Sequence, residues 1–164
     1  MVRFKNRWLL VEFIPTSSDA SILSIPDPVK SSPQTNFDGK QIYAALKQSI
    51  LNHYGDVGWG SVGLSLTVKY YSPVTNICII RVGRDHHKIA RGGVTLLESI
   101  EGIKCIPHVI HVSGTIKHAQ LAAIAHNREI IARYRAQAKA PVAYRDSYDS
   151  YLELSNQEIE ALQD

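Results

Sequence analysis

The stretch SVGLSLTVKYYSPVTNICIIRV (residues 61–82) decides the fold, because it holds the clearest strand pattern in the chain. Every second position from Val62 to Tyr70 is large and apolar or aromatic, and the positions between them are small or polar. Alternation with a period of two predicts a half-buried strand. SPVTN (72–76) has the composition of a turn, and ICIIRV (77–82) predicts a second strand. We therefore expect an antiparallel hairpin that starts at Val62.

The segments before the hairpin predict a strand, a loop and a helix. RWLLVEFI (7–14) is almost continuously apolar, which is typical of a well-buried strand. Residues 15–37 are rich in Ser, Pro and Asp and predict a loop insertion. A helix is expected from a cap at Asp38 to Gly55, because apolar residues recur there every four positions. GWGSVG (58–63) then predicts a glycine-rich turn, since a dinucleotide-binding G-x-G-x-x-G follows a strand and this one follows a helix.

The segments after the hairpin alternate between helix and strand. DHHKIARGGVTLLESI (85–100) has apolar residues at helical spacing, although its paired glycines weaken a helix. HVIHV (108–112) predicts a short strand, and Ile116 to Gln137 predicts a long helix. SNQEIEALQ (155–163) has a capping-box spacing and is capable of forming one more short helix.

This order of elements indicates the fold class. Strand, helix, strand, strand, helix, strand, helix is the order of an α+β, ferredoxin-like or RRM-like split-βαβ sandwich. We expect an antiparallel sheet with helices packed on it and an additional C-terminal helix. Residues 1–140 are predicted to form one RNA-associated domain, and residues 141–164 an acidic tail. Small regulatory ligand-binding domains share this plan, so the fold alone does not decide the function.

Charge and composition narrow the classes of function. Residues 1–140 hold 17 Lys and Arg against 9 Asp and Glu, whereas residues 141–164 hold one Arg against six acids. A basic body of this kind suits a polyanionic partner. The chain has no apolar run of the roughly 18 residues that cross a bilayer, and its start lacks the pattern of a secretory signal. We expect an intracellular protein without a membrane partner, with Cys78 and Cys105 as buried, reduced thiols.

The sequence gives no catalytic or metal-binding pattern. The closest histidine groups are His86-His87 and His108-x-x-His111, and no cysteine or carboxylate completes a ligand spacing around them. On a regular strand, His108 and His111 would also face opposite sides. The acids of the first 140 residues are few and scattered, and no nucleophile motif is present. We therefore predict no catalytic residue and no metal site in this chain.

Three groups of cations are candidates for contacts with nucleic-acid phosphates. The first lies at the N-terminus, the second spans a strand end and the start of the next helix, and the third lies on the last long helix. In SGTIK (113–117), Thr115 is placed to cap the last long helix, and the segment is either a plain capped turn or an anion site formed by free backbone N–H groups and Lys117. The predicted RNA-binding residues are Val2, Arg3, Lys5, Arg7, Arg81, Arg84, His87, Lys88, Arg91, Gly114, Thr115, Lys117 and Arg128.

The predicted sheet lacks the side chains with which RNA-recognition domains read bases. Those domains place aromatic residues on the third strand in a K/R-G-F/Y-G/A-F-V-x-F/Y pattern. The corresponding segment, TNICIIRV (75–82), contains no aromatic residue. Phosphate and shape recognition from loops and helix ends is therefore favoured over base stacking on the sheet.

Several of these stretches together resemble a known family. MVRFKNRWLLVEF (1–13), the hairpin VKYYSPVTNICIIRVGRD (68–85) and HVSGTIKHAQLAAIAHNREII (111–131) are similar to the small protein subunit shared by eukaryotic ribonuclease P and RNase MRP. This is the Pop-five family, which has archaeal relatives. The resemblance covers roughly residues 1–14 and 62–137. Trp8 stands where tyrosine is more usual in the family.

The resemblance implies a non-catalytic subunit of a ribonucleoprotein whose RNA performs the reaction. Ribonuclease P removes the 5′ leader of precursor tRNA, and RNase MRP cuts precursor ribosomal RNA. The implied partners are both catalytic RNAs, precursor tRNA, a barrel-fold subunit of about thirty kilodaltons and the other protein subunits. The chain itself is expected to bind no cofactor, with magnesium at the active site of the RNA. The implied location is the nucleus and nucleolus.

Two other readings remain open at the level of the sequence. A small-molecule-binding regulatory domain of the same fold would not need the basic N-terminus or the acidic tail. A metal-dependent nuclease acting alone would need clustered acids, which this sequence lacks. The long helix also carries more apolar residues than one small sheet needs, for example Ile124, Ile130 and Tyr134, and this excess predicts an interface with a protein partner.

Overall fold

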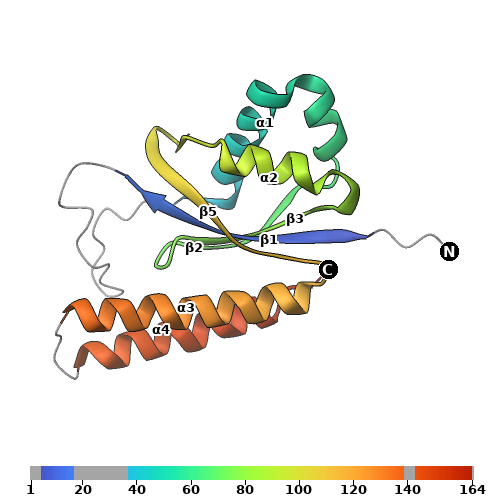
Figure 1. The fold of residues 1–164 in the computed structure, drawn as a ribbon. Helices are drawn as coiled ribbons and strands as arrows, with labels where there is room; N and C mark the ends of the chain where they lie inside the picture. The colour runs from blue at the N-terminus through green and yellow to red at the C-terminus, as the bar shows by residue number, and fades with distance from the viewer. Residues whose placement is uncertain (1–4, 17–36, 139–142, 164) are drawn as a thin grey trace.

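The computed structural model describes residues 5–16, 37–138 and 143–163, apart from the side chains at 137–138 and 143–146 (Figure 1). Val2 and Arg3, most of the expected loop insertion and the residues at 139–142 lie outside the described residues. No helix among the described residues has the length and apolar character needed to cross a membrane.

The centre of the fold is a five-stranded sheet in which every pairing is antiparallel. Its strand order is β2-β3-β1-β5-β4, which is the ferredoxin-like order with one very short strand added at an edge. The predicted fold class is confirmed. The strands are β1 (Asn6–Pro15), β2 (Thr67–Ser72), β3 (Ile77–Gly83), β4 (Ser99–Ile100) and β5 (Ile103–Ser113).

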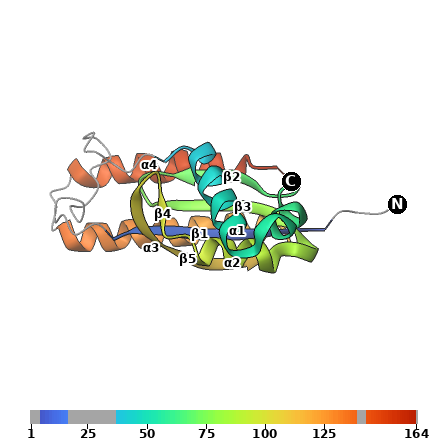
Figure 2. The same ribbon diagram turned by 90° about the horizontal axis from the view of Figure 1, so that it is seen from above.

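The helices cover both faces of this sheet. Figure 1 shows α1 and α2 on one face and α3 and α4 on the other, and the view from above in Figure 2 shows the first pair lying over the strands. The helices are α1 (Gly39–Val62), a short 3₁₀ turn η1 (Arg84–His86), α2 (His87–Thr95), α3 (Ile116–Ala138) and α4 (Ala143–Glu160).

Because both faces are covered, the sheet has a hydrophobic core on each side. Leu9 and Val11 of β1 pack with α1 and α2, whereas Trp8 and Leu10 pack with α3 and α4. All four side chains are fully buried. This two-sided burial explains why β1 reads as one continuous apolar run, without the alternation of a half-buried strand.

The predicted hairpin is present, but its first strand starts five residues later than expected. Residues up to Val62 are helical, and β2 begins at Thr67. Gly55 has φ 64° and ψ −169° and interrupts α1 without ending it, and the predicted turn at 58–63 is therefore mostly helix. Gly58 and Val62 are both buried and lie four residues apart, so they also fit one face of a helix. The alternating apolar pattern was compatible with either a strand or a helix, and the burial of these residues in the fold favours the helix.

The paired glycines of the 85–100 segment bring α1 and α2 close together. A Cβ atom at Gly93 would lie 2.3 Å from Cγ1 of Ile50 in α1. Ser49 Oγ of α1 also donates a hydrogen bond of 2.7 Å to the carbonyl oxygen of Gly93. The helix predicted for this segment is shorter than expected, because α2 ends at Thr95.

The acidic C-terminal segment forms a helix of 18 residues, longer than the short helix predicted from 155–163. Tyr148, Ser155 and Ile159 are buried, and Ile159 belongs to the core on the α3 face. The expected protein interface on α3 is wrong in part, since Ile124 and Ile130 are already buried in the same core. The division of the chain at residue 140 stays a prediction.

Buried polar contacts fix the position of α4. Gln120 Nε2 of α3 donates to the carbonyl oxygens of Ile159 at 2.8 Å, Leu162 at 3.1 Å and Glu160 at 3.3 Å. Ile159 and Glu160 lie at the end of α4 and Leu162 lies just beyond it, where backbone carbonyls lack the N–H donors of a following helical turn. Tyr70 OH lies 2.8 Å from Ser155 Oγ, so β2 is tied to the middle of the same helix.

Candidate nucleic-acid interface

The topology brings three of the predicted basic segments to one end of the sheet. The start of β1 lies between the end of β3 and the end of β5, since Asn6 pairs with Gly83 and Trp8 pairs with Ser113. In Figure 1 this end is on the right, where α3 also begins. We call it the basic end, and it comprises Lys5, Arg7, Arg81, Arg84, His87, Lys88, Gly114, Thr115 and Lys117.

Direct contacts connect the N-terminal cations to the other two segments. The backbone N–H of Arg84 donates a hydrogen bond of 2.8 Å to the carbonyl oxygen of Lys5. Arg7 Nη1 donates to the carbonyl oxygen of Asn6 at 3.1 Å. A Cβ atom at Gly114 would lie 3.2 Å from Arg7 Nη1, so the guanidinium group rests against the β5–α3 loop. The sequence predicted these cations separately, and the sheet register places them together.

The start of α3 has the predicted cap and one residue that the sequence analysis missed. Thr115 Oγ1 accepts a long hydrogen bond of 3.5 Å from the backbone N–H of His118 and lies 3.1 Å from His118 Nδ1. Ser113 Oγ donates a hydrogen bond of 2.7 Å to the carbonyl oxygen of Thr115 and so fixes the loop before the helix. Lys117 is exposed beside this cap. The sequence signal that could have identified His118 is its position three residues after the capping residue Thr115.

The η1–α2 segment contributes a second helix start to the basic end. His87 Nδ1 lies 2.6 Å from the carbonyl oxygen of Arg84, and a carbonyl only accepts, so Nδ1 carries the proton. Arg84, Lys88 and Arg91 are exposed. Arg91 lies three residues after Lys88, so it extends the cationic surface by one turn of α2.

Among the described residues, no carboxylate forms an ion pair with a cation of the basic end. The ion pairs among the described residues join Glu12 to His108 and His126, Glu129 to Arg133, and Arg135 to Asp149. None of these pairs includes a residue of the basic end. Asp85 is the nearest acid in sequence, and it forms no ion pair with a described residue. The surface is therefore suited to an external anion.

One predicted RNA-binding residue lies away from this surface. Arg128 follows Lys117 by eleven residues in the same helix, which corresponds to about 16 Å along the helix axis. The structure therefore does not bring Arg128 into the basic end. Arg133 and Arg135, also basic residues of α3, are held by Glu129 and Asp149 respectively.

The histidines of β5 and α3 form a structural contact with Glu12. His126 Nε2 lies 3.1 Å from Glu12 Oε2, and His108 Nδ1 lies 3.9 Å from the same oxygen. The hydrogen bond from His126 holds the pKa of Glu12 below its ordinary value, against the opposing effect of burial. No group of three or more metal-ligating side chains occurs in the described part of the chain.

A register shift places His108 and His111 differently from the prediction. His108 pairs with Glu12 and His111 pairs with Leu10, and the shift falls between these pairs. Glu12 and Leu10 are two residues apart on β1 and share a face, and cross-strand partners lie on the same face. His108 and His111 therefore share a face, and the expectation that they point to opposite sides is wrong.

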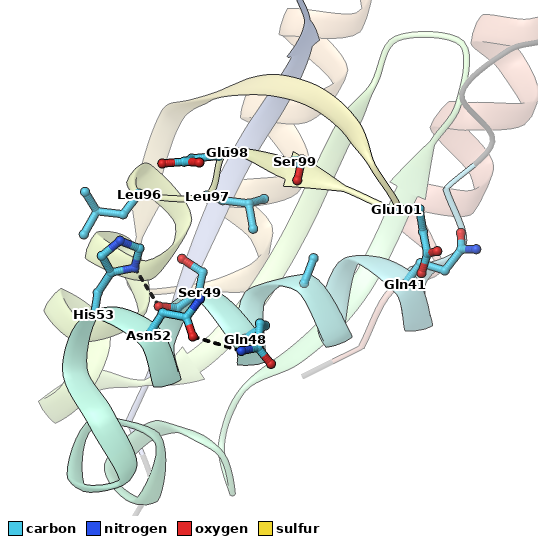
Figure 3. Close-up of a pocket in the computed structure, with 11 residues that line it drawn as sticks. Gln41, Gln48, Ser49, Asn52, His53, Leu96, Leu97, Glu98, Ser99 and Glu101 are labelled. Carbon is cyan, nitrogen blue, oxygen red and sulfur yellow. Dashed lines mark hydrogen bonds between the residues drawn. The ribbon is translucent and has the colours of Figure 1, made fainter.

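Away from the basic end, a hollow lies between α1 and the segment that joins α2 to β5 (Figure 3). Its lining includes the acids Glu98 and Glu101 and contains no Lys or Arg. Several lining groups already bond within α1, as in the 2.9 Å hydrogen bond from Gln48 Nε2 to Asn52 Oδ1. This hollow suits phosphate poorly, because its lining carries two acids and no Lys or Arg.

Together these features define a class: a ferredoxin-like α+β domain with both sheet faces covered and with cations at one end of the sheet that form no ion pair with a described carboxylate. The comparison with protein families then gives the identification. The chain belongs to the Rpp14/Pop5 family, whose model matches residues 7–124.

Named relatives and a solved structure agree with this assignment. The chain is 40% identical to the ribonuclease P/MRP protein subunit POP5 of Schizosaccharomyces pombe, over 80% of this chain and 91% of the relative. It is 33% identical to a probable ribonuclease P/MRP protein subunit POP5 of Arabidopsis thaliana, over 79% and 81%. A chain in a cryo-EM structure of yeast ribonuclease MRP shares the fold, with a TM-score of 0.51 and 10% identity over 81% of this chain and 98% of that one.

Proposed function

We propose that this chain is a non-catalytic protein subunit of ribonuclease P and RNase MRP that braces their RNA through the basic end. The observation that carries the proposal is the convergence of Lys5, Arg84 and Lys117 from three separate segments, without a carboxylate partner among the described residues. Membership of the Rpp14/Pop5 family, whose relatives bear the names of such subunits, supports the same role.

The geometry favours contact with the RNA backbone over reading of bases on the sheet. An RNA-recognition domain stacks bases on an open sheet face, and here α3 and α4 cover the corresponding face with Trp8 and Leu10 fully buried beneath them. Lys and Arg side chains and helix N-termini bind phosphate oxygens and fix the position of a protein on RNA. The subunit therefore positions RNA and contributes no reacting group.

The chemistry of the holoenzyme belongs to its RNA in this proposal. The described residues offer no acid cluster that would hold a catalytic metal ion, and the magnesium is assigned to the RNA active site. The substrates are precursor tRNA, cut at its 5′ leader, and precursor ribosomal RNA. The proposed location is the nucleus and nucleolus, where these precursors are processed.

The proposed protein partners are a barrel-fold subunit of about thirty kilodaltons and the other subunits of the two particles. Exposed apolar side chains remain available for such contacts, including one on α3 and one on α4. They are Ile14, Tyr54, Val57, Leu64, Leu96, Ile106, Leu121 and Leu154.

Purification from the native source tests the function directly. The tagged full-length chain should copurify with two enriched RNAs, and the purified particles should cleave precursor tRNA. Sequencing of the bound RNA identifies both species. Purification of the chain without an enriched RNA would contradict the proposal and favour the small-molecule alternative.

A further inference from the structure

A groove beside the basic end combines positive charge with an exposed apolar side chain. It lies between the end of α1 and the β3–η1 segment and has a volume of about 660 Å³. This volume is in the range of small-ligand sites. Its lining includes Lys5, Leu64, Ser65, Arg81, Arg84 and Asp85.

The positive charge of the groove comes from Lys5 just before β1, Arg81 of β3 and Arg84 of η1. Lys5 and Arg84 are exposed, and the 2.8 Å hydrogen bond between their backbones fixes their spacing. Arg81 Nε is buried and has no hydrogen-bond partner among the described residues. A buried donor without a partner is unfavourable in a folded protein.

The apolar part of the groove is Leu64, whose exposure of 101% equals that of a fully open side chain. The loop that carries it is nevertheless fixed. The N–H groups of Ser65 and Leu66 donate to the carbonyl oxygen of Val62 at 3.0 and 2.9 Å. A Cβ atom at Gly83 would lie 3.2 Å from Ser65 Oγ, so this loop also packs closely on the end of β3. The core does not use Leu64, and the fold presents it to solvent at the groove.

We propose that this groove holds a single unpaired nucleotide of the bound RNA. The proposal rests on the proposed function and adds a specific subsite to it. The phosphate lies against Lys5 and Arg84, and the base packs on Leu64, as unstacked bases do on apolar side chains. Asp85 also lines the groove, where its carboxylate repels phosphate and accepts hydrogen bonds from the N–H groups of a base edge.

The combination of cations and an exposed leucine in the groove favours a single nucleotide over an RNA duplex. A duplex presents phosphates and sugars and keeps its bases stacked inside, so Leu64 would gain no apolar partner. An extruded nucleotide offers both an anion and a flat apolar face, and the groove is lined by both cations and Leu64. An acidic, apolar peptide of another subunit is the competing occupant.

Site-specific photocrosslinking in the reconstituted holoenzyme separates these occupants. A benzoylphenylalanine placed at position 64 should crosslink to one unpaired nucleotide of the RNA. The same probe at Val57, which is 84% exposed and does not line the groove, is the matched control and should not reach that nucleotide. A crosslink from position 64 to a protein subunit or to a paired nucleotide, or no crosslink, would overturn the subsite.

A substitution gives an independent readout of the same subsite. Leu64→Ser should weaken RNA binding about fivefold, near the lower limit for loss of one base contact. It should leave the salt dependence unchanged, because no phosphate contact is lost. Val57→Ser should change neither quantity, and equal affinities for both variants would refute the proposal. If the parent chain binds no RNA at all, the proposed function fails; if only the Leu64 effects are missing, the subsite alone fails.

Discussion

Removal of two cations from the basic end should change the salt dependence of RNA binding without unfolding the domain. The informative variant is Arg84→Ala/Lys117→Ala, since both side chains are exposed and come from different segments. Neither side chain forms an ion pair with a described residue. Exposed substitutions of this kind usually change the free energy of unfolding by less than about 0.5 kcal/mol each.

The size of the effect follows from counterion release. Each phosphate contact contributes roughly 0.7 to 0.9 to the slope of log affinity against log salt. Loss of two contacts should therefore flatten the slope by about 1.4 to 1.8. Between 50 and 200 mM salt, the parent should lose about tenfold more affinity than the variant.

The matched control removes the same charge elsewhere. Lys40 lies in the first turn of α1, as Lys117 does in α3, and Lys104 lies near the start of β5. Both control side chains are exposed. Binding of the catalytic RNA is measured by filter retention over a salt series, and stability by thermal melts. If Arg84→Ala/Lys117→Ala and Lys40→Ala/Lys104→Ala give the same slope, the basic end is not the site of phosphate contact.

Three further predictions concern stability. Gly93→Ala should destabilise the fold by about 1–3 kcal/mol in urea denaturation, because the new Cβ atom would overpack against α1. Gly60→Ala is the control and should cause no such loss, because a Cβ atom there meets no atom within 4 Å. Equal losses of stability in the two variants would contradict the close approach of α1 and α2. The hydrogen bond with His126 lowers the pKa of Glu12, so the contribution of Glu12 to the free energy of unfolding is present above about pH 4.5 and is lost as the pH falls through the lowered pKa. Glu12→Gln should therefore flatten the dependence of stability on pH on the acid side, and an unchanged dependence would refute this assignment. Gln120→Ala removes the donor to three carbonyls at the end of α4 and should lower the free energy of unfolding by about 1–3 kcal/mol. Faster amide hydrogen exchange confined to residues 143–163 would support this prediction, and unchanged exchange would contradict it.

The sequence predicted the order of the elements because the apolar pattern of each was consistent with its final environment. β1 reads as a continuous run and is buried on both faces, and β3 packs alternate residues into the two cores. The start of β2 was misplaced because Val62, Leu64 and Leu66 alternate like a strand. In the structure α1 continues to Val62, and the buried residues Gly58 and Val62 lie four positions apart on one face of that helix.

The candidate site was predicted as separate segments and assembled only by the sheet register. The sequence identified Lys5, Arg84 and Lys117 as phosphate-binding candidates, but their proximity depends on three strands that meet at one end. The contact of Arg7 with Gly114 is a consequence of that register. The groove at Leu64 was not predicted, because a leucine in an alternating segment was assigned to a strand.

The length and role of α4 depended on contacts that no local pattern contains. Gln120 lies on α3 and binds the end of α4 almost forty residues later. The acidic composition of the tail indicated a solvated segment, whereas Tyr148 and Ile159 are buried. Long-range polar pairing of this kind has no signature in a single sequence.

The most direct test of the central claim is ultraviolet crosslinking of the native ribonucleoprotein, with mass spectrometry of the peptides that carry RNA. Crosslinked peptides should map to the basic end, namely residues 5–7, 81–88 and 114–118, and the attached RNA should be that of ribonuclease P or RNase MRP. Peptides from the hollow between α1 and the segment that joins α2 to β5, such as those around Glu98, should carry no RNA. Crosslinks that map to that hollow and are absent from the basic end would contradict the account.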